Sequence, residues 1–137
     1  DRGVRVLAGR EHSAAELVRK LTGKGIDPGE ARAVVADLAE RNLQSDERFT
    51  EAFVRSRVER GYGPLWIRQA LQQKGVADAL VAAHLDDPAA VWAERAERAR
   101  YRRFGETAPL LRTEWTRQAR FLAQRGFPTD IVVRVLG

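Results

Sequence analysis

Few residues in this chain could carry out catalysis, and they lie far apart. His12 and His84 are separated by 71 residues and show neither the H-E-x-x-H nor any other paired-histidine spacing of a metal site. The 137 residues include no cysteine, which excludes thiolate metal ligands and cysteine nucleophiles. We therefore interpret both histidines as capping or surface residues rather than as metal ligands.

Two short motifs that could suggest a catalytic site have simpler structural explanations. Gly61-Tyr62-Gly63-Pro64 lacks the Lys-Ser/Thr ending of a phosphate-binding loop, and a corner between two helices accounts for both glycines. The pair Asp86-Asp87 is explained more simply by the end of a helix than by a catalytic dyad. We predict a protein that is not an enzyme, with no catalytic residue, no metal site and no cofactor.

The basic charge is concentrated in the last third of the chain. Residues 1–91 hold 14 basic and 14 acidic residues, whereas residues 92–137 hold 10 Arg and 5 acidic residues and so account for the formal net charge of +5. Arg outnumbers Lys by 21 to 3, and its planar guanidinium favours bidentate contacts with carboxylates or phosphates. Genomic base composition can produce the same bias, so the bias alone does not establish a binding site.

Hydropathy gives no sign of a membrane segment. No apolar run approaches the roughly 20 residues that a spanning helix needs, and residues 1–10 lack the apolar core of a signal peptide. The absence of cysteine suits a reducing compartment. We expect a soluble, cytoplasmic protein with no membrane partner. The chain begins abruptly with helix-like residues, and we expect the natural protein to extend before Asp1.

One motif, Leu-x-x-Lys/Arg-Gly-apolar, recurs three times at intervals of 50 and 51 residues. Its three copies are Leu21 to Ile26, Leu71 to Val76 and Leu122 to Phe127. Glycine at its fifth position suits the left-handed conformation that follows the end of a helix. An internal repeat of this kind predicts tandem copies of one structural unit.

Boundary residues and apolar spacing predict helices in every copy. Ser13 and Glu16 form a capping box, and Pro28 and Pro64 suit the first turn of a helix. We predict helices over residues 2–10, from Ser13 to Lys24, after Pro28, from Asp46 to the corner at Gly61, from Pro64 to Lys74, after Gly75, from Pro88 to Phe104, from Leu111 to Gln124 and after Pro128.

No segment alternates apolar and polar residues over the length of a strand, which predicts an all-α fold. We predict one domain made of three tandem repeats of a three-helix unit, residues 1–44, 45–87 and 88–137. Stacked helices would give an elongated, curved arrangement on the order of 60–80 Å long. A molecule of that length could touch more than one subunit of a polymeric partner.

Short motifs in a fixed order cover nearly the whole chain. They are Arg10-Glu11-His12-Ser13 with Glu16-Leu17, Asp46-Glu47-Arg48-Phe49, Phe53-Val54-Arg55-Ser56-Arg57, Gly61-Tyr62-Gly63-Pro64 with Ile67-Arg68-Gln69, Gln73-Lys74-Gly75-Val76, Phe104-Gly105, and Arg120-Phe121-Leu122 with Arg125-Gly126-Phe127. In this order they resemble the RecX family, the bacterial regulators of the RecA recombinase. Two positions depart from the family pattern, because Trp66 stands where a basic residue is usual and Ala70 where Glu is frequent.

The resemblance implies a regulator that binds the RecA nucleoprotein filament in its helical groove, across neighbouring subunits. There it would block filament growth or promote disassembly. RecA activities, namely ATP hydrolysis, strand exchange and coprotease action, would be inhibited, and homologous recombination, DNA repair and the SOS response would be modulated. We expect a monomer, and weak direct binding to DNA stays open.

Two surfaces are candidates for binding RecA or DNA. The first is the exposed side of the middle repeat, with Arg55, Arg57, Arg60, Tyr62, Arg68, Gln72 and Lys74. The second is the basic last third, with Arg95, Arg98, Arg102, Arg103, Arg117, Arg120 and Arg125. A solvated helix face is an equally ordinary explanation for any single arginine among them. Trp66 fits either the core or an exposed anchor, whereas we expect Trp115 and Phe121 in the core.

Two alternatives belong to other functional classes. The first is a helix-turn-helix-type DNA-binding protein, with which the Gly61 to Pro64 corner is compatible. The neutral first two-thirds of the chain argue against it, because each unit should present its own basic recognition helix. The second is a helical repeat scaffold for another acidic partner.

Overall fold

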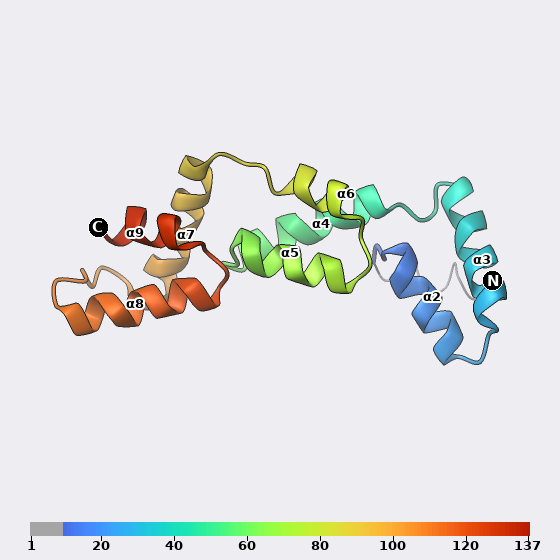
Figure 1. The fold of residues 1–137 in the computed structure, drawn as a ribbon, viewed down its shortest axis with the longest axis horizontal. Coiled ribbons are helices and arrows are strands. Elements are labelled where there is room, and N and C mark those ends of the chain that lie inside the picture. The colour runs from blue at the N-terminus through green and yellow to red at the C-terminus, as the bar shows by residue number, and fades with distance from the viewer. Residues whose placement is uncertain (1–9) are drawn as a thin grey trace. The chain divides into compact units, whose positions relative to one another are not determined.

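The computed structural model describes residues 10–137, which form eight helices and no strand (Figure 1). The predicted all-α fold is confirmed. The helix predicted over residues 2–10 lies outside the described residues, except for its last position. Within the described part of the chain, no helix is both long and apolar enough to span a bilayer.

The helix boundaries follow the local signals in the sequence. The helices are α2 Ala14–Gly23, α3 Pro28–Glu40, α4 Asp46–Glu59, α5 Pro64–Gln73, α6 Asp78–His84, α7 Ala89–Phe104, α8 Arg112–Gln124 and α9 Thr129–Leu136. Ser13 and Glu16 form the predicted capping box at the start of α2. Pro28 begins α3, whose first amides donate to the Asp27 side chain.

The residues group into two compact units. Unit 1 comprises the described residues up to Phe53 together with Leu71–Val81, and unit 2 comprises Val54–Ala70 and Ala82–Gly137. Each unit therefore draws on both α4 and α5. The predicted repeat boundaries stay a prediction, as does the elongated, curved arrangement of the repeats.

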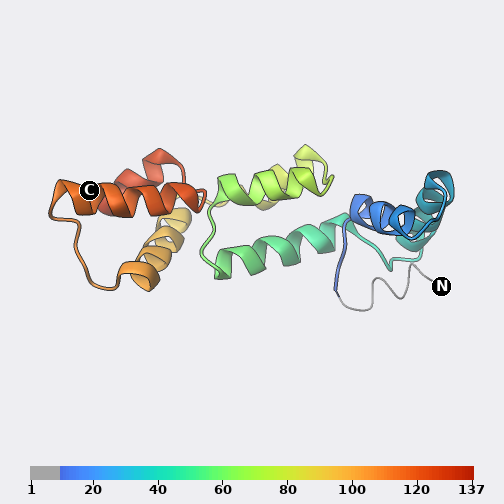
Figure 2. The ribbon, with the colours of Figure 1, turned by 90° about the horizontal axis from the view of Figure 1, so that it is seen from below.

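The core of unit 1 lies between α2 and α3, which pack against each other (Figures 1 and 2). Its buried aliphatic side chains come from both helices, and burying a Leu or Val among them contributes about 1.5–3 kcal/mol. They are Leu17, Leu21, Ala31, Val35 and Leu38. The rings of Phe49 and Phe53 add a tilted pair with centroids 5.7 Å apart.

In unit 2, α7, α8 and α9 pack against one another (Figures 1 and 2). The buried side chains at their contacts are Trp92, Ala96, Ala99, Leu122, Phe127, Ile131 and Val132. Trp115 and Phe121 are only partly buried, so the prediction that both are core residues was wrong. Trp115 Nε1 reaches the chain end and donates to the Gly137 carbonyl at 3.1 Å.

A buried polar side chain fixes the segment between α7 and α8. Gln118 is fully buried, and its Nε2 donates to the Thr107 carbonyl at 2.9 Å. Arg100 donates to the same carbonyl and to Gln118 Oε1. Residues 105–111 join α7 to α8. These hydrogen bonds hold the middle of that segment against both helices.

Candidate functional site

The repeated glycine corners follow α2, α5 and α8, and all three adopt the predicted left-handed conformation. The φ angles are +91° at Gly25, +76° at Gly75 and +98° at Gly126. A Cβ on Gly75 would lie 2.5 Å from the Cβ of Ala15, and one on Gly126 would lie 2.5 Å from the backbone nitrogen of Trp66. A Cβ on Gly25 would have no neighbouring atom of the described residues within 4 Å. Two of the three corners therefore receive the first turn of an earlier helix.

The first junction, in unit 1, joins the Lys74–Gly75 corner to the start of α2. Ser13 Oγ donates to the Lys74 carbonyl at 2.7 Å. The carboxylate of Glu16 accepts from Lys74 Nζ at 3.2 Å and from an Arg10 guanidinium nitrogen at 3.0 Å. The charge of Lys74 is thus compensated inside unit 1.

Glu16 is the ionic centre of the first junction. Burial by itself would raise the pKa of Glu16, but hydrogen bonds from Arg10, Ser13 and Lys74 outweigh it and lower this pKa to about 2. The carboxyl is therefore ionised wherever the protein is near neutral pH. The charges of this junction are therefore compensated, and we call it a latch to distinguish it from an open binding site.

The second junction, in unit 2, joins the Arg125–Gly126 corner to the start of α5 through backbone atoms. The Gly63 amide donates to the Arg125 carbonyl at 2.7 Å, and the Leu65 amide donates to the Gly126 carbonyl at 3.0 Å. A Cβ on Gly63 would lie 2.6 Å from the Gly126 carbonyl. Because backbone atoms make these bonds, the Arg125 side chain is left available for other contacts.

Aromatic rings and guanidinium groups form one stack beside the second junction. The Tyr62 and Trp66 rings lie with centroids 4.0 Å apart and an interplanar angle of 23°. Arg125 lies 4.7 Å from the Tyr62 centroid, and Arg57 lies 6.0 Å from the Trp66 centroid. Both rings are partly buried. Trp66 is therefore neither a fully buried core residue nor a free anchor.

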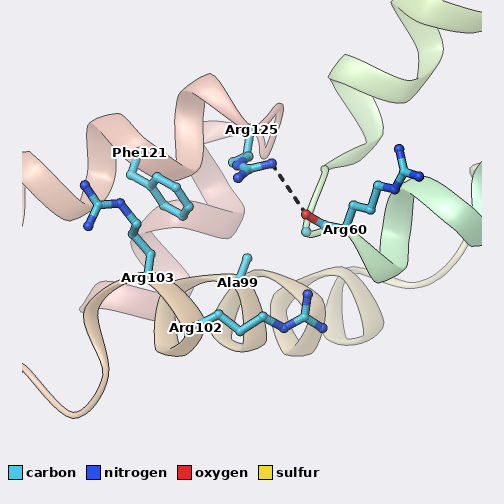
Figure 3. A pocket seen from close by; sticks show the side chains of 7 residues that line it. Arg60, Ala99, Arg102, Arg103, Phe121 and Arg125 are labelled. Atoms are coloured by element: carbon cyan, nitrogen blue, oxygen red, sulfur yellow. Dashed lines mark hydrogen bonds between the residues drawn. The ribbon is translucent and has the colours of Figure 1, made fainter.

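Four of the predicted partner-binding arginines line one hollow of about 150 Å³ in unit 2, which we name the arginine hollow (Figure 3). Arg60 comes from the end of α4, Arg102 and Arg103 come from α7, and Arg125 follows α8. Gly61, Ala99 and Phe121 complete the lining. In Figure 3 the Phe121 ring lies between the side chains of Arg103 and Arg125.

The charges of the arginine hollow are not compensated by carboxylates. Arg102 Nη1 donates to the Glu59 carbonyl at 2.6 Å, and Arg125 Nη1 donates to the Arg60 carbonyl at 3.4 Å. These acceptors are neutral groups at the end of α4. Among the described residues, none of the four arginines is in an ion pair. The hollow therefore concentrates positive charge and can bind an anion.

Other predicted basic residues do have acidic partners. Arg95 pairs with Asp87 at 2.8 Å and Arg117 pairs with Glu114 at 3.1 Å. The pKa of Glu114 is lowered, chiefly by the hydrogen bond from Gln118. Such exposed pairs typically contribute at most about 1 kcal/mol. Their charges are already partly offset by a neighbouring carboxylate.

The fourteen predicted residues are spread over both units. Gln72 and Lys74 belong to unit 1 and the other twelve belong to unit 2. Exposed on the surface are Arg55, Arg68, Gln72, Arg98 and Arg120. The structure thus brings the four arginines of the hollow together and leaves several others apart. Contact of any of these residues with a partner stays a prediction.

His12 departs from its predicted role. Its side chain is only 2% exposed, with Nδ1 3.0 Å from the Arg10 carbonyl and Nε2 3.0 Å from Lys20 Nζ. The capping or surface role was wrong, because Ser13 caps the helix and His12 is buried. Burial, followed by the charges of Arg10 and Lys20, lowers the pKa of His12. Within residues 10–137, no three His, Asp or Glu side chains are placed to hold a metal ion.

Family models match all three parts of the chain. The model described as RecX, first three-helix domain, matches residues 1–38, the second three-helix domain matches residues 45–85 and the third matches residues 93–136. The chain belongs to the RecX family. The family resemblance in the sequence and the three-helix repeats are both confirmed.

Relatives in the RecX family are similar over most of their length. A protein named Regulatory protein RecX from Halorhodospira halophila is 48% identical over 132 residues, covering 96% of this chain and 82% of that protein. One of the same name from Stenotrophomonas maltophilia is 43% identical over 133 residues, covering 97% and 82%. These relatives are named as regulators rather than as enzymes.

Solved RecX structures share the fold. A crystal structure of RecX from Lactobacillus salivarius matches with a TM-score of 0.81 at 19% identity, covering 98% of this chain and 89% of that one. A second structure, described as regulatory protein RecX, also gives a TM-score of 0.81 at 22% identity, covering 98% and 68%. At such low identity the likeness concerns the fold alone.

Proposed function

We propose that this protein regulates the RecA recombinase by binding the RecA nucleoprotein filament. Bound across neighbouring subunits, it would inhibit ATP hydrolysis, strand exchange and coprotease activity, and so modulate recombination, DNA repair and the SOS response. It would act as a non-catalytic partner in the bacterial cytoplasm. Family membership supports the proposal, because close relatives carry the name Regulatory protein RecX.

The single observation that supports a binding role for this chain itself is the arginine hollow. Four arginines line one hollow, and among the described residues no carboxylate forms an ion pair with any of them. A nucleoprotein filament is rich in phosphates and carboxylates, for which a guanidinium is a bidentate donor. The hollow therefore offers a surface of the right sign and donor type for such a polymer.

Titration against three targets separates the proposed function from its rivals. The targets are RecA filaments on single-stranded DNA, the bare DNA and RecA without DNA, each at several salt concentrations. Tighter binding to the filament than to either component supports the proposed function. Equal or tighter binding to bare DNA favours a DNA-binding protein, and no binding to any target favours a scaffold for another partner.

A charge reversal tests which surface binds the filament. Changing Arg98, Arg102 and Arg103 together to Glu should weaken inhibition of the DNA-dependent ATP hydrolysis of RecA. Circular dichroism should show unchanged helicity, which matters because Arg102 also donates to the end of α4. Unchanged inhibition by a folded variant would remove α7 from the binding surface.

A further inference from the structure

A second basic surface lies along one exposed face of α8 in unit 2, beside a shallow hollow that we name the α8 hollow. Three arginines and two threonines line it. They are Arg112, Thr113, Thr116, Arg117 and Arg120. Guanidinium and hydroxyl groups are both donors, so this lining also suits an anion.

One aromatic ring links the two hollows. Arg103 of the arginine hollow lies 5.2 Å from the centroid of Phe104, and Arg117 of the α8 hollow lies 5.0 Å from the same centroid. Both guanidinium groups thus contact the same ring. The two hollows form one basic track within unit 2, interrupted by the carboxylate of Glu114 on Arg117.

The arginines of the track keep most of their donors. A guanidinium that stacks on a ring uses its face, so its in-plane N–H groups stay available. Arg125 stacks in this way near Tyr62 and Phe121, at 4.7 Å and 5.3 Å from the centroids. Arg125 and Arg102 each give one further bond to a backbone carbonyl. Each of these two guanidinium groups uses one of its five N–H donors in that bond, which leaves other N–H donors to contact a ligand.

The polar side chains that line the arginine hollow, of about 150 Å³, are all arginines, so its side-chain donors suit an anion. The neighbouring Tyr62 and Trp66 rings already have contacts on their faces, so they are poor platforms for stacked bases. The lining selects the backbone of a strand rather than its bases.

The length of the track favours a polymer with a negative charge at every unit. A single carboxylate or free phosphate would occupy one hollow and leave the other uncompensated. An acidic peptide would need consecutive carboxylates, each on a flexible side chain that loses entropy when it is fixed. A sugar–phosphate backbone supplies regularly spaced anions without that requirement.

We propose that unit 2 directly binds the sugar–phosphate backbone of a nucleic-acid strand along this track. One phosphate occupies the arginine hollow, and a later phosphate of the same strand occupies the α8 hollow. Binding is independent of base sequence and requires no helix in a groove. The proposal goes beyond binding to RecA and holds whether or not the filament is the partner.

The test uses the whole chain and bare DNA without RecA. The probes are a fluorescein-labelled oligo(dT) of about 30 nucleotides and a labelled duplex of about 30 base pairs. Binding is followed by fluorescence anisotropy at salt concentrations from about 25 to about 200 mM, the range in which phosphate contacts make affinity strongly salt-dependent. The variant Arg60→Gln with Arg103→Gln removes two hollow charges, and neither side chain donates a hydrogen bond to any of the described residues. The matched control, Arg32→Gln with Arg134→Gln, removes two exposed charges elsewhere.

The expected result is a change in both affinity and salt dependence. The hollow variant should weaken binding at least about fivefold and reduce the log–log salt slope on the single strand by about 0.7, the value for the one phosphate contact that the hollow makes. The control should change affinity less than about twofold. A second variant, Arg112→Gln with Arg120→Gln, should reproduce the loss from the other hollow.

Several outcomes would overturn the proposal. Absence of binding to both probes at about 25 mM salt, an equal loss in the control, or an unaffected slope in both hollow variants would each do so. Equal competition by polyglutamate at the same charge concentration would assign the track to acidic proteins. Binding of pyrophosphate, without binding of either probe, would assign it to free phosphates.

Discussion

The two junctions use the same repeated corner but differ in what happens to its basic residue. Lys74 and Arg125 hold the same position of the motif, directly before Gly75 and Gly126. In the first junction Glu16 compensates Lys74 at 3.2 Å. In the second junction the partners of the Arg125 side chain within residues 10–137 are a neutral carbonyl and aromatic rings.

The difference can be traced to the third residue of the helix that starts at each junction, α2 in the first and α5 in the second. The spacing of 50 residues between repeats places Trp66 where the first repeat has Glu16. Glu16 reaches the corner as a carboxylate, whereas Trp66 stacks on Tyr62. One residue therefore decides whether the corner is a compensated latch or a source of free positive charge.

The largest loss of stability should come from a side chain added at Gly126 in the second junction. Gly126→Ala should lower the free energy of unfolding by about 2–5 kcal/mol, combining about 1–2 kcal/mol for the left-handed conformation with overpacking against Trp66. Gly25→Ala has the same conformation but open space and should cost only about 1–2 kcal/mol. Urea titration followed by circular dichroism measures both.

Gly63→Ala completes this comparison, because Gly63 is not in the left-handed region but packs on Gly126. It should lower stability by about 1–3 kcal/mol through crowding alone. Equal small losses at Gly25, Gly63 and Gly126 would mean that the second junction is not formed in solution.

The next effect is the pH dependence of the first junction. The pKa of Glu16 is about 2 in the folded chain against an ordinary value of 4.5, so its stabilisation is present above pH 4.5 and lost as pH falls toward 2. The loss should amount to roughly 3 kcal/mol at one pKa unit per 1.36 kcal/mol. Urea titrations of the parent and of Glu16→Gln at several pH values measure it, and parallel curves for the two proteins would contradict the latch.

A smaller loss of stability should follow from changing the residue at position 66. Trp66→Glu gives the second junction the residue type of the first and removes the stack with Tyr62, which should cost about 1 kcal/mol of stability. The new carboxylate should compensate Arg125 and lower the salt slope of oligo(dT) binding by about 0.7. Trp66→Gln is the uncharged control, and an equal slope for both variants would show that position 66 does not control the charge of Arg125.

The sequence was sufficient for those features that depend on neighbouring residues. Ser13, Pro28 and Pro64 act within one turn of a helix, and Gly75 acts within one corner, so their effects could be predicted locally. The repeat of the corner motif was also visible because its copies keep their spacing. The helices, their ends and the three-helix plan follow from these signals.

Features that depend on distant segments could not be predicted in this way. Arg60, Arg103 and Arg125 come from three parts of the chain, and only the packing of α7 and α8 with the end of α4 brings them to one hollow. The burial of His12 and Gln118 likewise depends on carbonyls and side chains supplied by the fold. A basic composition indicated an anion partner, but it did not distinguish compensated from uncompensated arginines.

Measuring affinity for the RecA filament tests most directly whether the uncompensated arginines of unit 2 bind the partner. Arg60→Glu with Arg103→Glu should weaken filament binding at least about tenfold, a change of roughly 1.4 kcal/mol. Arg32→Glu with Arg134→Glu carries the same change in net charge and should weaken it less than about twofold. Equal losses in the two variants would contradict a localised site and leave only the overall charge of the molecule.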